Sequence, residues 1–212
     1  MPPEPVVLAF DTSAAHCAAA VVSGSRILAE RVEQMDKGQA ERLMPLLAEV
    51  LAEAQVAYAG LSAIGVGTGP GNFTGVRISV AAARGLALGL GIPAIGVTGF
   101  EALATGLPDD AVTLLDARRG ALWVAGQGID PQLVDLPDIP DQINGRPLVG
   151  HRAAEVALQT GGPLLEQPLP VAVAIARIAA QRLGRPQPRP SPLYLRAADA
   201  ALPSDPPPVI LP

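Results

Sequence analysis

The sequence predicts an α/β protein built around a mixed β-sheet. Three short apolar segments within residues 5–33 are typical of neighbouring antiparallel strands. Helical and strand patterns then alternate as far as residue 105, which favours parallel strands connected by helices. Because 49% of the 212 residues are hydrophobic and only 3% are aromatic, we expect a core made mostly of Ala, Val, Leu and Ile.

The three N-terminal strands are separated by turn signals. Residues 6–10 form a continuous apolar run, typical of a buried strand, that ends in Asp11-Thr12-Ser13. Residues 16–22 predict the second strand, and Ser23-Gly24-Ser25 suits a hairpin turn because glycine accepts a positive φ. Residues 26–33 alternate in character and predict the third strand.

The next segment alternates between helix and strand. Leu and Val at three- and four-residue spacing predict an amphipathic helix over 39–54, in which Pro45 either distorts the first turn or marks the start of the regular helix. The pattern then predicts a strand, a long helix, a strand and a short helix, at 63–67, 74–90, 93–97 and 100–105 respectively.

The second part of the chain has weaker signals and many prolines, which keep regular elements short. We expect a hairpin with strands at 112–116 and 121–126, helices at 152–159 and 170–183, and an extended proline-rich linker at 185–192. We expect residues 197–212 to form a flexible tail.

Charge and composition exclude several classes of protein. The formal charge of −5, with neither half of the chain basic, argues against a protein that mainly grips nucleic-acid phosphates. Cys17 is the single cysteine, so an internal disulfide and a thiol-based zinc site are excluded. Arg84, Pro93 and several glycines interrupt the most apolar stretch, 78–97, so no membrane span is predicted, and we expect a soluble cytoplasmic protein without membrane attachment.

A glycine-rich loop joins the strand at 63–67 to the long helix. Its glycines and the free N–H groups at the start of the helix are features of anion sites. The spacing nevertheless matches neither a dinucleotide fingerprint nor a P-loop, since Asn72 replaces the third glycine and Gly-Lys-Ser/Thr is missing. We therefore interpret Gly69, Gly71, Thr74 and Gly75 as a structural loop.

The long helix carries small residues on two faces, and two arginines share one of its faces. One face would suffice for packing on its own sheet. The second face would pack against another helix, either the helix at 39–54 or one from another chain, and the sequence leaves both possibilities open. Arg77 and Arg84 bind partner carboxylates or are simply solvated. The predicted partner interface consists of Leu43, Leu47, Arg77, Ser79, Ala83, Arg84 and Gly85.

The sequence predicts neither a catalytic residue nor a metal site. His16 and His151 have no carboxylate or histidine four residues away, and Cys17 points to the opposite face of its strand from His16. Asp116 and Arg118 lie at a strand end, where an Asp-x-Arg pair can be a local ion pair.

Several motifs together resemble one family. Six short segments are similar, in this order, to motifs of the bacterial TsaB (YeaZ) family. They are Phe10-Asp11-Thr12-Ser13, the run 42–47, Gly69-Pro70-Gly71-Asn72-Phe73-Thr74-Gly75-Val76-Arg77-Ile78, the run 85–87, Leu115-Asp116-Ala117-Arg118-Arg119-Gly120 and the run 192–196. The run 69–78 is the specific one. Two positions depart from the family pattern: Gln39 replaces a histidine, which removes an argument for a metal there, and Asn72 replaces a serine.

The resemblance implies an actin-like ATPase fold of two ribonuclease-H-like halves with mixed sheets, the second half reduced. We place an N-terminal domain at 1–105, whose two helices would form the dimer surface as the resemblance implies, and a smaller, degenerate domain at 106–196. In such folds an aspartate after the first strand organises ATP and its metal, so Asp11, Thr12 and Ser13 are either a vestigial phosphate loop or simply turn formers, which we favour.

The resemblance also implies a function. The chain would be a non-catalytic activator and scaffold of the TsaD paralogue, which forms N6-threonylcarbamoyladenosine in tRNA next to the anticodon. The ATPase TsaE would join this assembly, and tRNA would be contacted through the complex. Self-association into a homodimer is the alternative use of the predicted partner interface. No cofactor would bind tightly, and ATP or ADP would bind only at a complex interface. The competing hypotheses are an actin-like ATP-dependent kinase or transferase acting alone, and a peptidase, against which the missing metal ligands argue.

Overall fold

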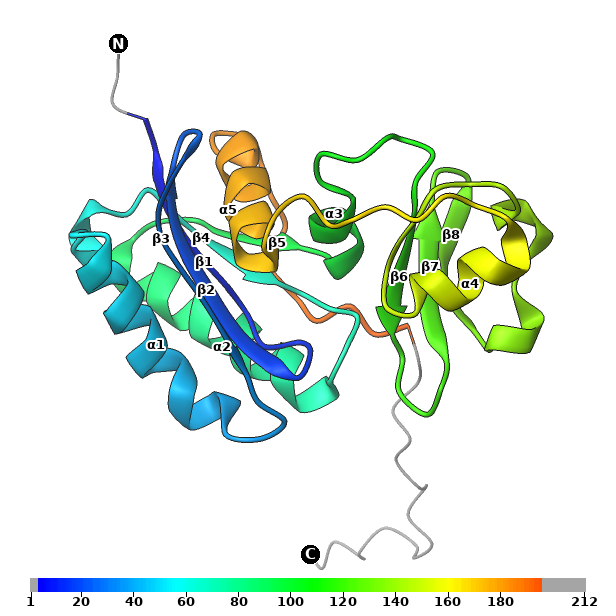
Figure 1. The fold of residues 1–212 in the computed structure, drawn as a ribbon. Coiled ribbons are helices and arrows are strands. Elements are labelled where there is room, and N and C mark those ends of the chain that lie inside the picture. The colour runs from blue at the N-terminus through cyan, green and yellow to red at the C-terminus, as the bar shows by residue number, and fades with distance from the viewer. Residues whose placement is uncertain (1–3, 196–212) are drawn as a thin grey trace, which may run out of the picture.

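Two mixed sheets organise the protein in the computed structural model, which describes residues 4–195 (Figure 1). The first sheet has the strand order β3-β2-β1-β4-β5, with β1 antiparallel to β2 and parallel to β4. Its strands are β1 (Val6–Asp11), β2 (His16–Ser23), β3 (Arg26–Gln34), β4 (Ala63–Gly67) and β5 (Ala94–Val97). The three antiparallel strands and the parallel continuation confirm the predicted mixed sheet.

Helices cover both faces of this first sheet. Leu8 and Phe10 of β1 point to one side and pack with α1 (Gln39–Glu53) and α2 (Phe73–Leu90). Val7 and Ala9 point to the other side and pack with α5 (Val171–Arg182). Since successive strand residues alternate between faces, a strand buried on both faces is apolar throughout.

The second half repeats the strand arrangement of the first on a smaller scale. Its sheet has the order β8-β7-β6-β9, in which β6 is antiparallel to β7 and parallel to β9. The strands are β6 (Val112–Asp116), β7 (Leu122–Gly126), β8 (Ile129–Val134) and β9 (Leu148–Gly150), and α4 (Ala153–Thr160) packs on them. This half has one strand fewer, in agreement with the expectation of a reduced second half.

Short connecting elements complete the chain. The helix α3 (Gly99–Ala104) begins with a capping box between Thr98 and Glu101. Three single turns of 3-10 helix lie at Tyr58–Gly60, Leu136–Asp138 and Asp141–Ile143. The predicted tail at 197–212 lies outside the described residues.

Helix α5 packs on the first sheet although its residues fall within the range 106–196. A side chain at Gly65 would lie 3.1 Å from the Cβ atoms of both Ala9 and Ala179, so small residues let α5 approach β1 and β4 closely. In Figure 1, α5 lies beside β1 and β5 rather than beside the second sheet. The layer structure of the N-terminal half is therefore completed by a late segment, and the division at residue 105 stays a prediction.

Two strands differ from the sequence analysis, and the structure decides the place of Pro45, which the sequence left open. Strands β8 and β9 were not predicted, since β8 contains Pro131 and β9 has only three residues. Proline is tolerated in β8 because this strand is at the edge of its sheet. The helix α1 begins at Gln39, so Pro45 lies inside it, on an exposed position where one missing N–H is least disruptive.

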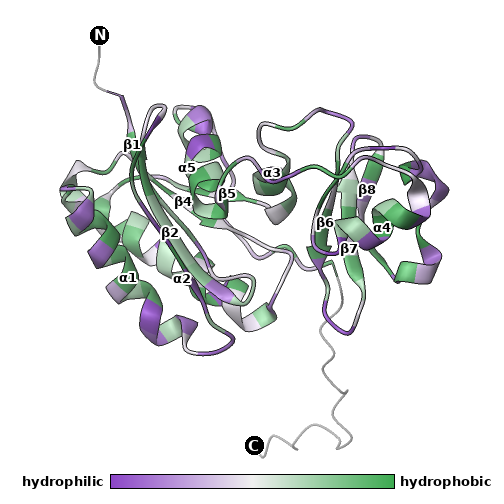
Figure 2. Cartoon of the chain, viewed as in Figure 1, coloured by the Kyte–Doolittle hydropathy of each residue, from purple (hydrophilic) through white to green (hydrophobic). Residues whose placement is uncertain are grey.

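Hydropathy distinguishes the two helices on the outer face of the first sheet. Figure 2 shows hydrophilic residues along α1, whereas α2 is largely apolar from end to end. Among the described residues, α2 is the one helix that is long and apolar enough to cross a membrane by length and composition alone, and its buried side packs against the first sheet. A core helix of a folded domain meets the same criterion.

Candidate functional site

The turn after β1 is held by the Asp11 carboxylate. Asp11 is 2% exposed, and its Oδ2 accepts hydrogen bonds from the Ser13 N–H at 3.1 Å and the Ser13 hydroxyl at 2.8 Å. His16 Nε2 lies 2.8 Å from the same oxygen. The Asp11–His16 contact was not predicted, because it joins residues five apart across a hairpin rather than along a helix. Asp11 therefore has the turn-forming role that the sequence analysis favoured.

The glycine-rich loop is seated directly on this turn. A Cβ atom at Gly71 would lie 2.2 Å from the Ser13 carbonyl oxygen, and one at Gly75 would lie 1.9 Å from the Thr12 carbonyl oxygen. The Asn72 N–H donates to the Ser13 carbonyl at 2.6 Å, and the Thr12 hydroxyl donates to the Gly75 carbonyl at 2.7 Å. The two segments thus form one rigid unit at the carboxyl ends of β1 and β4.

The start of α2 follows from the same loop. The Asn72 side chain accepts a hydrogen bond from the Thr74 N–H at 3.2 Å and so caps the helix. Gly69 has a φ of +84°, a value that favours glycine. These contacts agree with our interpretation of the loop as a structural connection.

A cavity of about 530 Å³ lies between the two halves, next to this turn. Asp11 and His16 line it from the first half, together with Lys37, which follows β3 and is the only lysine of the chain. Asp116 and Arg118 line it from the end of β6, and the Asp116 carboxylate accepts a hydrogen bond from the Arg118 N–H at 2.7 Å. The cavity therefore mixes acidic and basic groups.

The Asp11 carboxylate and the glycine loop both make close contacts within the first half. The Oδ2 atom of Asp11 is already engaged by Ser13 and His16, and Oδ1 lies against Gly67. The space that glycines leave for phosphates in nucleotide loops is here filled by the carbonyl oxygens of Thr12 and Ser13. Within residues 4–195, no three His, Cys, Asp or Glu side chains come together in a group that could hold a metal ion.

Cys17 is separate from both histidines. It is fully buried between the first sheet and α1, and burial, reinforced by the charge of Glu33, raises the pKa of its thiol to about 11. A thiol with a raised pKa is a poor nucleophile.

The predicted partner interface divides into buried and exposed residues. Leu43 and Leu47 are at most 1% exposed, and both pack inside the protomer. Ser79 and Ala83 are fully buried, and the Ser79 hydroxyl donates to the Gly67 carbonyl. These four assignments to a partner interface were wrong, because the face of α1 that carries Leu43 and Leu47 and the face of α2 that carries Ser79 and Ala83 are both buried inside the protomer.

The other small-residue face of α2 is exposed. Ala81, Gly85 and Gly89 are on this face, and a Cβ atom at Gly85 or Gly89 would have no neighbour within 4 Å. Met44 of α1 and Leu88 of α2 are 44% and 86% exposed, although sequence analysis did not select them. We call this exposed side of α1 and α2 the outer helix surface. Of the predicted interface residues, Arg77, Arg84 and Gly85 are exposed.

Arg77 is held at one end of α2 by aromatic residues. Its guanidinium lies 3.6 Å from the centroid of the Phe73 ring, and its Nε donates to the Tyr194 hydroxyl at 2.8 Å. The Phe73 and Tyr194 rings are 4.9 Å apart. The structure thus brings together two of the motifs, 69–78 and 192–196, that are remote in the sequence.

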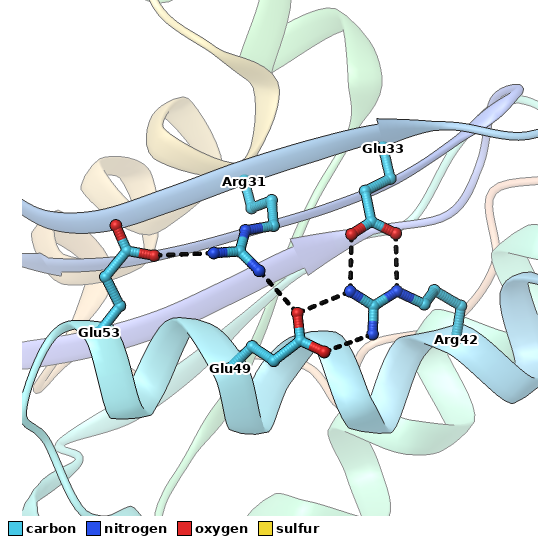
Figure 3. Close-up of polar contacts among 5 residues, drawn as sticks. All are labelled: Arg31, Glu33, Arg42, Glu49 and Glu53. Atoms are coloured by element: carbon cyan, nitrogen blue, oxygen red, sulfur yellow. Dashed lines mark hydrogen bonds and ion pairs between the residues drawn. The ribbon is translucent and has the colours of Figure 1, made fainter.

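A network of ion pairs fixes α1 to β3 (Figure 3). Arg42 donates two hydrogen bonds to Glu33 and two to Glu49, all between 2.6 and 2.7 Å, and Arg31 links Glu49 to Glu53. The hydrogen bonds from Arg42 lower the pKa of Glu33 and of Glu49. Helix α1, which supplies part of the outer helix surface, is therefore fixed in position against the sheet.

Comparison with known proteins assigns the family. The family described as "TsaD: tRNA N6-adenosine threonylcarbamoyltransferase" matches residues 26–139, just over half of the chain. The tRNA threonylcarbamoyladenosine biosynthesis protein TsaB of Bacillus subtilis is 37% identical over 120 residues, and that of Escherichia coli is 32% identical over 124 residues. YeaZ from Pseudomonas aeruginosa superimposes with a TM-score of 0.69 at 26% identity, covering 90% of this chain and all of the other. The chain belongs to the TsaB family.

The extent of these matches differs among TsaB family relatives. The alignments cover 55% and 56% of this chain, and 52% and 53% of the B. subtilis and E. coli proteins. The uncharacterized protein Rv3421c of Mycobacterium tuberculosis is 33% identical over 201 residues, covering 92% of this chain and 93% of its own length. The fold is shared more widely: component A of (R)-2-hydroxyglutaryl-CoA dehydratase from Acidaminococcus fermentans has a TM-score of 0.55 at 10% identity.

Proposed function

We propose that this chain is a non-catalytic subunit of the assembly that forms N6-threonylcarbamoyladenosine in tRNA next to the anticodon. It activates and scaffolds a TsaD paralogue, which carries out the transfer, and the ATPase TsaE joins the assembly. The relatives named for this biosynthesis support the pathway. tRNA is contacted through the complex, and any ATP or ADP is bound at a complex interface.

The observation that carries the scaffold role is the outer helix surface. Ala81, Gly85 and Gly89 leave the backbone of α2 accessible, and the protomer places nothing over the two glycines. A glycine inside a helix costs about 0.5–1 kcal/mol relative to alanine, so a protomer gains nothing from these positions. Small side chains permit close helix–helix packing, which is the use that a partner helix would make of this face.

The first test is co-purification with the TsaD paralogue of the same organism. Ala81→Trp places a large side chain on the outer helix surface, whereas Ala154→Trp makes the same change at an exposed position of α4. We expect Ala81→Trp to abolish a heterodimer that Ala154→Trp leaves intact. An intact heterodimer in Ala81→Trp would refute this surface as the interface.

The second test is reconstitution of the tRNA modification with and without this chain. We expect modification by the paralogue to need the chain and to fail with Ala81→Trp. Light scattering on the chain alone then measures whether it forms a homodimer. A homodimer that Ala81→Trp disrupts would show that self-association uses the same surface when the paralogue is absent. Full modification without the chain would overturn the proposal.

A further inference from the structure

A second groove, of about 610 Å³, lies where α2 and α5 end beside β5. The end of α2, the turn at 91–93, β5 and the proline-rich segment 183–190 form its walls. Residues 185–192 were predicted to be an extended linker, and Pro190 of that stretch is buried against Gly96 of β5. We call this feature the arginine groove.

The lining of the arginine groove combines apolar and basic side chains. Leu88, which is 86% exposed, lines it together with Ile92 and Leu183. Four arginines also line it, at 84, 182, 185 and 189, and no aspartate or glutamate is among its lining residues. This contrasts with the cavity between the two halves, where acidic and basic groups are mixed.

Three of these four arginines have no acidic partner among the residues that the structure describes. Arg182 is engaged by Glu101 and by the Gly96 carbonyl. In residues 4–195, the side chains of Arg84, Arg185 and Arg189 form no hydrogen bond or ion pair, and all three residues are exposed. Elsewhere in the protein, arginines such as Arg42 are paired with glutamates.

The positive charge of the arginine groove exceeds the negative partial charge of the helix C-termini beside it. A helix C-terminus carries a partial charge of about −0.5, and both α2 and α5 end here, so together they amount to about one negative charge. Arg84, Arg185 and Arg189, which have no side-chain partner within residues 4–195, therefore leave an excess of positive charge beside the apolar lining residues. Carboxylates at the rim would relieve the mutual repulsion of these guanidinium groups and form charge-assisted hydrogen bonds with them.

We propose that the arginine groove binds an acidic peptide segment of a partner protein, in which aliphatic side chains alternate with glutamate or aspartate. The aliphatic side chains cover Leu88 and Ile92, and the carboxylates pair with Arg84, Arg185 and Arg189. RNA fits less well, because no aromatic side chain lines the groove for base stacking and the protein is acidic overall. The groove shares Arg84, Gly85 and Leu88 with the outer helix surface. Its peptide binding is measured on this chain alone, so a failure of that test would leave the heterodimer test unaffected.

The test is fluorescence anisotropy with a labelled heptapeptide of alternating glutamate and leucine. Two further peptides, with lysine for glutamate or serine for leucine, measure the contributions of charge and of apolar contact. We expect the glutamate–leucine peptide to bind and to weaken at least fivefold between about 50 and 500 mM salt. We expect at least tenfold weaker binding of the lysine peptide and weaker binding of the serine peptide.

Matched variants locate the site. Arg84→Glu and Arg185→Glu should each weaken binding about tenfold, while Arg26→Glu, at an exposed position of the β2–β3 hairpin, should leave it unchanged. Leu88→Ser should weaken binding, whereas Leu158→Ser, at a position 88% exposed on α4, should not.

Three results would overturn the proposal. These are the absence of binding by the glutamate–leucine peptide, an equal loss in Arg26→Glu, and tighter binding of a labelled uridine hexanucleotide that Arg84→Glu abolishes. The last would identify the groove as an RNA site. All substituted side chains are exposed, and circular dichroism of each variant checks that the fold is retained.

Discussion

Two glycines of the same helix, Gly75 and Gly85, should respond in opposite ways to replacement by alanine. At Gly75 the new Cβ would lie 1.9 Å from the Thr12 carbonyl oxygen, where ordinary contacts begin near 3.4 Å, so the turn or the helix must move by about 1.5 Å. At Gly85 the new Cβ meets no atom within 4 Å. The pair therefore isolates the contact between α2 and the Asp11–Ser13 turn.

The expected magnitudes follow from this geometry. Forcing an atom into a packed position costs about 1–3 kcal/mol, and the shift also weakens the hydrogen bond from the Thr12 hydroxyl to Gly75, worth about 1 kcal/mol. The gain in helix propensity, at most about 1 kcal/mol, offsets part of this cost at Gly75. We expect Gly75→Ala to lower the free energy of unfolding by about 1–3 kcal/mol and Gly85→Ala to raise it by about 0.5–1 kcal/mol.

Thermal and urea unfolding of the two purified variants measure this difference. For a chain of this size, 1 kcal/mol corresponds to roughly 2–4 °C in melting temperature, so the two variants should be separated by roughly 3–16 °C. Equal stabilities of Gly75→Ala and Gly85→Ala would refute the conclusion that the glycine-rich loop is built to seat on the turn. A stabilised Gly85→Ala that no longer binds the TsaD paralogue would in addition support close packing of a partner at that position.

Further predictions concern titration, reactivity and ligand binding. Because hydrogen bonds from Arg42 hold the pKa of Glu33 and of Glu49 below the usual value, their stabilising contribution is present above about pH 4.5 and is lost as the pH falls through the lowered values. Urea unfolding at several pH values should therefore show a shallower dependence of stability on pH between about 5 and 3 in Arg42→Gln, and an unchanged slope would contradict this. The buried Cys17 thiol, whose pKa is raised to about 11, should react with a thiol reagent at pH 8 only at the rate of unfolding, and rapid labelling of the folded protein would argue against its burial. Calorimetry with magnesium and ATP should show no binding to the chain alone, whereas binding that is lost in Asp11→Ala would support the kinase or transferase hypothesis instead.

The N-terminal half was largely predictable because its patterns are long and regular. Alternation in 26–33, the apolar run 6–10 and the helical spacing in 39–54 each extend over enough residues to reveal a period. In the second half, β9 has three residues and β8 contains a proline that only an edge position tolerates. Edge position is a property of the assembled sheet, so local sequence does not reveal it.

The candidate surfaces were predictable only in part. Small residues at four-residue spacing on α2 identified two faces suited to close packing, but spacing does not say what covers each face. The structure buries Ser79 and Ala83 against the protomer and leaves Ala81 and Gly85 exposed. Likewise, Arg84 and Arg185 are about a hundred positions apart, and only the packing of α5 beside β5 brings them to one groove.

The sequence by itself determined the family and the order of strands and helices in the first half, because these depend on local periodicity and on specific short motifs. The tertiary structure decided which face of α2 is exposed, that α5 returns to the first sheet, and that Asp11 is engaged by Ser13 and His16. These outcomes depend on contacts between residues remote in the chain or across a turn, and burial is settled only when all layers are assembled.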